Sequence, residues 1–301
     1  MSPQRRSLVV GASGQVGHHI ALALGAGRAI CAVRKAATPD EFSMDLANLT
    51  EPSLELLRMV RESQLDAVYC AGAMTHVDRC ESAPEEAMRV NSRGPAALAA
   101  AAAEGNLPFV FFSSDYVFDG KNGPYTEDAA PNPLSVYGRS KLAGESEVRK
   151  AHPGALIIRT TVVYGSDPAR KNFLYSLRRA CMEDKPFRAP VDQISTPTYN
   201  RDLAEAAIRL VRAGQSGVFN VSGPDQLTRY EFAKIAIRAM GLSDSNLEPV
   251  ETAELHQPAP RPLNGGLLTE KLIRSLPDLR MRSAEEGVRE WMAQDPPVLG
   301  N

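Results

Sequence analysis

The sequence predicts an α/β fold in which a doubly wound parallel sheet is joined to a smaller C-terminal lobe. Short β-rich runs alternate with longer helical segments through the first 165 residues, which is the βαβ pattern of a parallel sheet. The runs are almost continuously apolar, as expected for strands that helices cover on both faces. Beyond about residue 166 proline becomes frequent and the alternation stops, which indicates a second lobe.

Five apolar runs are the predicted strands of this sheet. Each of the first four is followed by a longer segment rich in alanine, leucine, glutamate and arginine. A sixth run, GVFNVSG at 217–223, follows the change of rhythm, and we predict that it returns to the same sheet. The five are SLVVGA (7–12), AICAVR (29–34), LDAVYCAG (65–72), LPFVFFSS (107–114) and ALIIRTTVVYG (155–165).

Helices are predicted between and after these strands. Residues 86–105 form an alanine-rich helix that Gly94 and Pro95 should kink or bound at its inner end. Its small side chains would allow close packing on the sheet or on a second subunit, which suggests a homodimer. Further helices are predicted at 18–24, 202–213 and 229–240.

The composition excludes several classes of partner. With 301 residues, 43% of them apolar, the chain can bury a large core. A net charge of -2 gives no bulk attraction to nucleic acid or to anionic membranes. There is no leader pattern and no apolar run near the roughly 20 residues of a bilayer span, so we expect a cytoplasmic protein. The cysteines and histidines lack paired spacing, so we predict no protein-held metal.

A glycine-rich turn follows the first strand. GASGQVG places Gly11, Gly14 and Gly17 three apart, and a helix follows. Glycines let backbone N–H groups approach a pyrophosphate, and the helix N-terminus adds a positive dipole. The spacing is not the standard GxGxxG, and such turns also occur for structural reasons, but the position in an N-terminal βαβ unit favours a nucleotide. The predicted cofactor-binding residues here are Gly11, Ser13, Gly14, Gln15, Val16 and Gly17.

The end of the second strand indicates which dinucleotide is bound. An NAD-preferring fold usually places a carboxylate there, but this chain has Arg34 and Lys35. Cations suit a 2′-phosphate, so we predict NADPH or NADP rather than NADH; the alternative is that both cations point to solvent. Further predicted contacts are Asp45 and Leu46 beside the adenine, and Cys70, Ala71 and Gly72 beneath the middle of the cofactor.

These assignments predict a domain organisation. Residues 1–165 form the NADP-binding Rossmann domain, and residues 190–222 return to it. Residues 166–189 and 223–301 form the substrate-binding lobe.

The stretch PNPLSVYGRSKLAGE contains a candidate catalytic pair. A spacing of four puts Tyr137 and Lys141 on one face of a helix, and a nearby ammonium is predicted to lower the pKa of the phenol. Ser114, at the end of a strand, would face the same cofactor and donate to a carbonyl oxygen. Asn91 would organise water behind the lysine, or serve as a buried structural amide. A lone Tyr-x-x-x-Lys is usually a surface pair, but the glycine turn and Ser114 make coincidence an unsatisfactory explanation.

Several motifs together resemble a known family. GASGQVG, AGAMTHVDRCE, SSDYVFDG, YGRSKLAGE, RTTVVYG, DQISTPTYNRDLA and, more faintly, RPLNGGLLTEKL are similar to those of extended short-chain dehydrogenases/reductases, closest to the dTDP-4-dehydrorhamnose reductase group. The resemblance implies a catalytic Ser114, Tyr137 and Lys141, NADPH as hydride donor, and a nucleotide-sugar substrate between two lobes. It places that substrate near Thr75, His76, Val77, Asp78, Ser114, Val162, Asn172, Asp192, Gln193, Pro197 and Thr198.

The departures from that group fall on the substrate side. Ser114 replaces a threonine and keeps the hydroxyl, whereas Val162 stands where the reductases carry a tryptophan. His76 replaces a small residue, and His19 replaces a glutamate that some members use in metal-assisted dimerisation. The identity of the sugar therefore stays open.

Three functions are compatible with the resemblance. The leading one is an NADPH-dependent reductase of a nucleotide-activated 4-keto-deoxysugar. The same family includes the non-catalytic β subunit of methionine adenosyltransferase, so a regulatory NADP-binding subunit is an alternative. A nucleotide-sugar epimerase or dehydratase is another, but a dehydratase needs an acid at the sugar. Asp115, one residue beyond Ser114 in an extended strand, is expected to face away from it.

Overall fold

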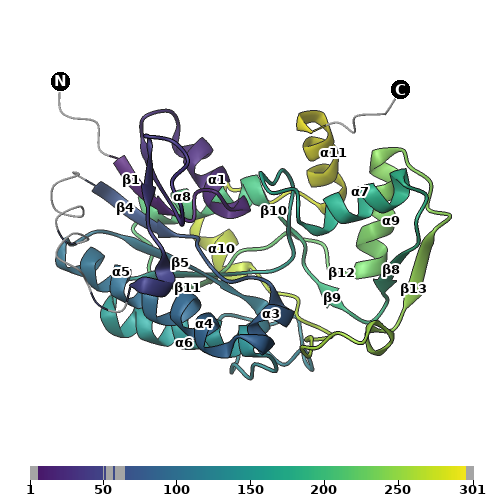
Figure 1. Ribbon diagram of the computed structural model, residues 1–301, viewed down its shortest axis with the longest axis horizontal. Helices are drawn as coiled ribbons and strands as arrows, with labels where there is room; N and C mark the ends of the chain where they lie inside the picture. Colours follow the sequence, from purple (N-terminus) through teal and green to yellow (C-terminus); the bar gives the residue numbers. More distant parts are fainter. Residues whose placement is uncertain (1–5, 50, 52–56, 58–64, 296–301) are drawn as a thin grey trace.

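The computed structural model describes residues 6–49, 51, 57 and 65–295. They form an elongated molecule in which a layered α/β part lies beside a smaller lobe, as Figure 1 shows.

The central sheet has seven strands in the order β11-β6-β5-β4-β1-β2-β3. Every neighbouring pair is parallel, so the predicted doubly wound sheet is confirmed, and so is the predicted return of 217–223 as β11. The strand order reverses beside β1, which places a ligand crevice at the carboxyl ends of β1 and β4. The strands are β1 Arg6–Val10, β2 Ala29–Val33, β3 Glu41–Ser43, β4 Leu65–Cys70, β5 Phe109–Ser114, β6 Leu156–Thr160 and β11 Gly217–Asn220.

Helices cover both faces of the sheet (Figure 1). On one face Ile20, Leu203 and Leu272 bring α1, α8 and α10 into a single apolar core with the strands. On the other face Leu98 and Val148 do the same for α5 and α6. None of the described helices is long and apolar enough to cross a membrane. The helices of this part are α1 Gln15–Leu24, α3 Val77–Ser82, α4 Pro84–Met88, α5 Gly94–Glu104, α6 Val136–Ala151, α8 Asn200–Arg212 and α10 Glu270–Ser275, with short turns η1 Leu46–Asn48 and η3 Asp115–Val117.

The predicted strand at 155–165 is interrupted, so its length was wrong. β6 ends at Thr160, and the next strand, β7 (Val163–Tyr164), leaves the sheet to pair with β10 (Thr198–Tyr199). Between them Val162 has a φ of +42°, a left-handed conformation that β-branched residues rarely adopt. An apolar run records burial but gives no sign of a backbone turn inside it.

The predicted helix at 86–105 is three consecutive segments. α4 leads into a π-helical turn, η2 (Arg89–Arg93), and then into α5. A Cβ on Gly94 would lie 2.2 Å from the backbone oxygen of Leu46 in η1. Any larger residue would clash there, so glycine is required for α5 to pack this closely on η1. Pro95 lies in the first turn of α5, where a missing N–H is tolerated. Most alanines of α5 are buried inside the chain, and a homodimer stays a prediction.

The smaller lobe has an apolar core of its own, around the fully buried Trp291. Leu174 and Leu177 of α7 and Phe232 and Ile237 of α9 pack in it. Its elements are α7 Phe173–Met182, β8 Phe187–Pro190, β9 Ile194–Ser195, β12 Leu227–Thr228, α9 Arg229–Met240, β13 Leu247–Val250, η4 Thr252–Leu255 and α11 Ala284–Gln294.

Residues 259–268, the crossing segment, run from this lobe back to the sheet. The N–H of Ile194 donates to Leu263 O (2.6 Å) and the N–H of Tyr125 donates to Gly266 O (2.7 Å). The segment therefore bonds to β9 of the lobe and to the loop after β5, and it holds the two parts together beside the carboxyl ends of the strands.

Candidate active site

The glycine turn packs directly on the turn that follows β4. Gly11 has a φ of +82°, and a Cβ on it would lie 2.5 Å from the Cα of Gly72. A Cβ on Gly17 would lie 2.3 Å from the oxygen of Gly11. No side chain fits at these positions, so the structure brings the two predicted cofactor segments together at the crevice of the sheet.

The start of α1 has the chemistry that a pyrophosphate needs. Gly14 precedes the helix and supplies no side-chain cap to the first turn, whose N–H groups carry the positive end of the helix dipole. Beside them the Nε2 of Gln15 is buried without a hydrogen-bond partner in the described chain. A buried donor without an acceptor is costly unless a ligand supplies one, so these residues fit an anionic dinucleotide.

The other predicted cofactor residues lie around this turn. Arg34 and Lys35 follow β2 directly and are exposed, and no ion pair of either occurs in the ranges described. Asp45 accepts a hydrogen bond from the N–H of Ala47 (3.0 Å), so it caps η1. Leu46 is buried against Gly72, where a Cβ would lie 2.9 Å from its side chain. Among the described residues neither cation has a carboxylate partner that would compete with a phosphate. Binding of the phosphate, and contact of Asp45 and Leu46 with adenine, stay predictions.

Tyr137 lies in the first turn of α6 with its side chain turned inward. The hydroxyl of Ser135 accepts from the N–H of Gly138 (3.1 Å) and caps the helix. The ring of Tyr137 is 8% exposed and meets the ring of Tyr116 edge-on, with centroids 5.4 Å apart. Its apolar surroundings include Met74, Cys80 and Ala87.

The predicted lowering of the tyrosine pKa is wrong for this structure. Burial raises the pKa of Tyr137 above its usual value, because the phenolate would lose its hydration. A hydrogen bond with Ser114 acts in the opposite direction on that pKa but does not compensate. The helical spacing was correct, but a sequence shows spacing and not solvation. A phenol that stays protonated at neutral pH is suited to donate a proton rather than to accept one.

Lys141 lies one turn further along α6 and is 2% exposed. Its Nζ lies 4.3 Å from the centroid of the Phe111 ring, and no carboxylate pairs with it within the described residues. Burial lowers the pKa of Lys141 to about 8, an effect that nearby Cys70 and Glu145 partly oppose. A buried ammonium that packs on an aromatic face and has no carboxylate partner among the described residues is available to a ligand.

Asp115 lies beside Ser114 and does not face away from it, so that prediction was wrong. β5 ends at Ser114 and the chain turns at once into η3, so the alternation of a strand no longer applies. The Ser114 hydroxyl donates to Asp115 Oδ1 (3.0 Å), and Thr161 donates to Oδ2 (2.7 Å). Burial raises the pKa of Asp115 to about 6, against those two hydrogen bonds.

Asn91 is a structural amide in this fold. Its Oδ1 accepts from the N–H of Met74 (2.8 Å), and its Nδ2 donates to Met74 O (3.1 Å) and to Ser140 Oγ (2.9 Å). These bonds connect the turn after β4 to the middle of α6. Of the two roles considered from the sequence, they support the structural one.

The predicted substrate residues after β4 form the start of α3. Thr75 and His76 are exposed, and His76 Nδ1 accepts from the N–H of Arg79 (3.2 Å). Asp78 is engaged by Arg261, whose Nη2 lies 2.9 Å from both carboxylate oxygens. Asp78 is therefore paired within the chain, and Val77 packs against the apolar cluster around Tyr137.

The remaining predicted substrate residues divide into two groups. Val162 and Thr198 lie next to Asp115 and Ser114, because Thr198 Oγ1 donates to the oxygen of Thr161 (2.8 Å), whose hydroxyl bonds to Asp115. Pro197 directly precedes Thr198. Asn172 instead caps α7, and Gln193 Nε2 donates to Thr252 Oγ1 (3.1 Å). Asp192 also bonds to Thr252. The first group lies near the site, and the second has structural bonds within the smaller lobe.

Arg229 is a site residue that the sequence reasoning missed. It begins α9, and its guanidinium carbon lies 5.5 Å from the centroid of the Phe173 ring. Burial lowers the pKa of Arg229, and Tyr116 and Asp115 are the groups that oppose this most. No carboxylate pairs with it in the parts of the chain described. Its sequence position, at a helix start after a turn, gave no sign of burial.

The comparisons with known proteins settle the family. The sequence model described as RmlD substrate binding domain matches residues 5–295. The chain belongs to this family. The dTDP-4-dehydrorhamnose reductase of Sinorhizobium fredii is 34% identical over 280 residues, which are 87% of this chain and 93% of that protein. The solved structure of dTDP-4-dehydrorhamnose reductase from Bacillus anthracis str. Ames in complex with NADP has a TM-score of 0.86 and 28% identity, covering 97% of this chain and 99% of its own.

A relative with a different name is also similar to this chain. Methionine adenosyltransferase 2 subunit beta of Danio rerio is 31% identical over 288 residues, which are 90% of this chain and 85% of that protein. Both resemblances predicted from the motifs are therefore confirmed.

His19, one of the departures from the resembled group, is buried in this member of the RmlD family. His19 is 4% exposed, and its Nε2 lies 3.0 Å from Ser166 O. Burial lowers the pKa of His19, which favours the neutral ring. Within the described residues no group of three His, Cys, Asp or Glu side chains could hold a metal ion.

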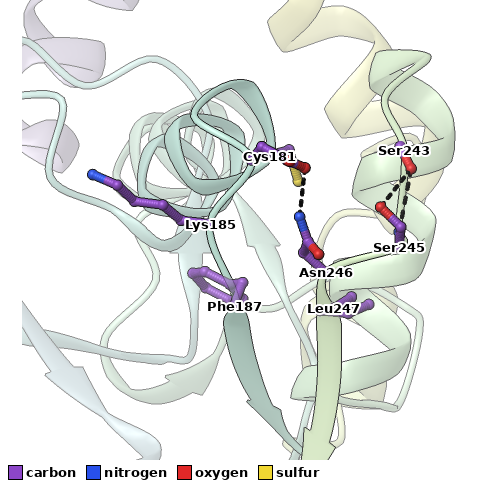
Figure 2. Close-up of a pocket in the computed structure, with 8 residues that line it drawn as sticks. Cys181, Lys185, Phe187, Ser243, Ser245, Asn246 and Leu247 are labelled. Atoms are coloured by element: carbon purple, nitrogen blue, oxygen red, sulfur yellow. Dashed lines mark hydrogen bonds between the residues drawn. The ribbon is translucent and has the colours of Figure 1, made fainter.

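A small hollow in the smaller lobe is separate from the candidate active site. Figure 2 shows that it lies between the end of α7 and the start of β13, and Asn246 there donates to Asp184 (2.6 Å). None of the predicted catalytic, cofactor or substrate residues lines it. Ser243 and Ser245 bond to each other there, and Lys185 pairs with Glu183, so we assign the hollow no part in the candidate site.

Proposed function

We propose that the protein is an NADPH-dependent reductase of a nucleotide-activated 4-keto-deoxysugar, of the dTDP-4-dehydrorhamnose reductase type. The observation that carries this is the buried cluster of Ser114, Tyr137 and Lys141 at the ligand crevice of an RmlD-family fold. A surface pair would be hydrated, whereas Ser114, Tyr137 and Lys141 are all buried, and Lys141 has no carboxylate partner among the described residues.

NADPH supplies a hydride to the carbonyl carbon when it is bound. Tyr137 then gives its hydroxyl proton to the carbonyl oxygen, so the C=O bond becomes CH–OH and the tyrosine takes a new proton from solvent. Burial raises the pKa of Tyr137, which keeps the donor protonated until the more basic alkoxide develops. Ser114 places a second hydroxyl beside the same oxygen and stabilises its negative charge.

The charged residues around the cluster hold the two ligands. Lys141 orients the nicotinamide ribose through its unpaired ammonium, and Arg34 and Lys35 bind the 2′-phosphate. The glycine turn and Gln15 hold the pyrophosphate. Arg229, a partly buried guanidinium with no carboxylate partner among the described residues, gives a site for an anionic group of the substrate.

The test is to follow NADPH oxidation by the purified protein over a panel of nucleotide-linked 4-ketosugars, with simple ketones as controls. Turnover of the nucleotide sugars, with a decrease of about 10²–10⁴-fold in kcat for Tyr137→Phe, is the expected result. Tyr230→Phe, which changes a tyrosine on α9, is the matched control. Activity on simple ketones alone contradicts the substrate class, and a Tyr137→Phe variant that turns over normally contradicts the proton donor.

A regulatory subunit is the second candidate, favoured by the similarity to methionine adenosyltransferase 2 subunit beta. The expected sign is co-purification with a larger enzyme whose kinetics change on binding, while the isolated protein oxidises no NADPH. An epimerase or dehydratase would instead retain tightly bound oxidised cofactor, and Asp115 at Ser114 supplies the acid that a dehydratase needs. Exchangeable NADPH with net consumption separates the reductase from both. A cytoplasmic location and a homodimer are part of this proposal, tested by fractionation and by size in solution.

A further inference from the structure

The first turn of α6 has a second cap that comes from a distant part of the chain. Besides the local cap from Ser135, the N–H of Val136 donates to Glu81 Oε1 at 2.7 Å. Glu81 lies in α3, and Val136 directly precedes Tyr137. A carboxylate at a helix N-terminus satisfies an otherwise unpaired N–H and interacts favourably with the dipole. Glu81 thus fixes the backbone at the residue next to the proton donor.

Glu81 makes no competing ion pair in the part of the chain that the structure describes. The other acidic residues nearby behave differently, because Glu85 pairs with Arg93 and Glu86 pairs with Arg79. The carboxylate of Glu81 is therefore committed to the start of α6.

The helix that carries Glu81 also contacts the tyrosine ring itself. Val77 and Cys80 of α3 belong to the apolar cluster that surrounds Tyr137. The backbone and the ring of the catalytic residue are thus held by the same six-residue helix, through a hydrogen bond and through packing.

The opposite end of α3 is anchored as well. Asp78 accepts from the N–H of Ala259 (3.1 Å) and pairs with Arg261, both in the crossing segment. Gly265 of that segment packs on Asp115, since a Cβ there would lie 2.7 Å from Oδ2. α3 is therefore fixed between the crossing segment and the start of α6, and Glu81 cannot move independently of either.

We propose that Glu81 is a positioning residue that acts through the Val136 N–H to place the hydroxyl of Tyr137 for proton transfer. The expected change in kcat rests on the proposed reductase function. The expected change in the backbone at Val136 rests only on the hydrogen bond from Val136 to Glu81. Misplacement of a reacting group by about 1 Å lowers a rate strongly, so a cap at the neighbouring residue affects kcat more than it affects ligand binding.

The experiment compares Glu81→Ala, Glu81→Gln and the control Glu85→Ala, a surface carboxylate in the next helix. Glu81→Ala should lower kcat about tenfold, leave the Kd of NADPH within about twofold, and increase the solvent deuterium isotope effect on kcat as proton transfer becomes limiting. Glu81→Gln keeps an acceptor oxygen and should restore most of kcat, and Glu85→Ala should match the wild type.

A second readout does not depend on turnover. Hydrogen exchange of the peptide that spans Val136 should be faster in Glu81→Ala than in the wild type or Glu81→Gln. Unchanged exchange overturns the proposal even if no nucleotide sugar is reduced, and absence of wild-type turnover with accelerated exchange overturns only the reductase function. Equal losses of kcat and NADPH affinity, an unchanged isotope effect, or a kcat loss explained by the unfolded fraction would show a merely structural role.

Discussion

Lys141 and Glu145 are buried charged residues one helical turn apart on α6. Glu145 has an oppositely charged partner and Lys141 does not, among the described residues. Glu145 accepts from Arg159 through both oxygens (2.9 and 2.7 Å) and from Ser113 (2.6 Å). Lys141 is equally buried but faces the ring of Phe111, and it has no ion pair in the described ranges. One helix therefore carries a fully paired charge and an unpaired one.

The difference teaches that burial of a charge does not by itself indicate function. The pair of Arg159 with Glu145 joins β6 to α6 and leaves no charge available for a ligand. Lys141 and Asp115 have no counter-charge paired with them among the described residues, although an unpaired buried charge destabilises a fold. A position that keeps such a charge is one where a ligand or a reaction requires it. From this comparison we expect Glu145 to contribute to stability and Lys141 to serve a ligand.

The largest change in stability is expected when the ion pair of Arg159 with Glu145 is broken. Arg159→Met leaves Glu145 buried without its partner and should lower the free energy of unfolding by about 3–5 kcal/mol, measured by urea denaturation. The double variant Arg159→Met with Glu145→Leu should recover much of that loss, because both charges are then absent. A single variant as stable as the wild type would remove the structural role of the pair.

Removal of the charge of Lys141 should raise the free energy of unfolding rather than lower it. Lys141→Met should raise the free energy of unfolding at pH 7 by about 1–3 kcal/mol while it abolishes most of the turnover. Since the pKa of Lys141 is lowered to about 8, the folded state resists protonation. The gain should be present below pH 8 and should vanish as the pH rises towards the unfolded value near 10.5. A loss of stability in Lys141→Met at pH 7 would contradict the comparison.

Asp115 is a second buried charge without a paired counter-charge among the described residues, and its effect on the free energy of unfolding should depend on pH. Its pKa is raised to about 6 from a usual 3.8, so its contribution is fully favourable below about 3.8 and is lost as the pH rises through about 6. Asp115→Asn, neutral at every pH, should therefore stabilise the protein by about 1–2 kcal/mol at pH 8 and less at pH 5. Thermal unfolding of the variant and the wild type at both values measures this. An equal difference at the two pH values would exclude titration of Asp115 as the cause.

The smallest stability effect is expected at an exposed unpaired cation. Arg34→Ala should change the free energy of unfolding by less than about 0.5 kcal/mol but should weaken NADPH about tenfold more than NADH. Titration with each dinucleotide and a melting curve test both parts. Equal weakening of the two dinucleotides would remove the phosphate-binding role.

The parallel sheet could be predicted because each apolar run corresponds to a buried strand. The smaller lobe could be predicted only from the end of the strand–helix alternation. Its strand pairs, such as β8 with β13, are short and contain Pro190 and Pro249. The break at Val162 could not be predicted, because the left-handed φ of that residue is imposed by its surroundings.

The positions of the proposed catalytic residues could be predicted because their order and spacing follow from the topology, whereas their catalytic roles stay a prediction. Ser114 ends a strand and Tyr137 and Lys141 share one helix face, and both features are visible in the sequence. The position of Asp115 depends on where the chain turns after β5, and the partial burial of Arg229 depends on how the two parts pack. The pKa of Tyr137 depends on solvation, which no spacing reports.

Synthesis of the chain releases β6 before its outer neighbour exists. β11 begins at Gly217 and pairs with β6 along Leu156–Arg159, so at about 5–20 residues per second the ribosome needs several seconds to deliver it. Until then the nascent protein has an open sheet edge, which is a template for pairing with other chains. Closure of that edge must wait until the first elements of the smaller lobe have also left the ribosome.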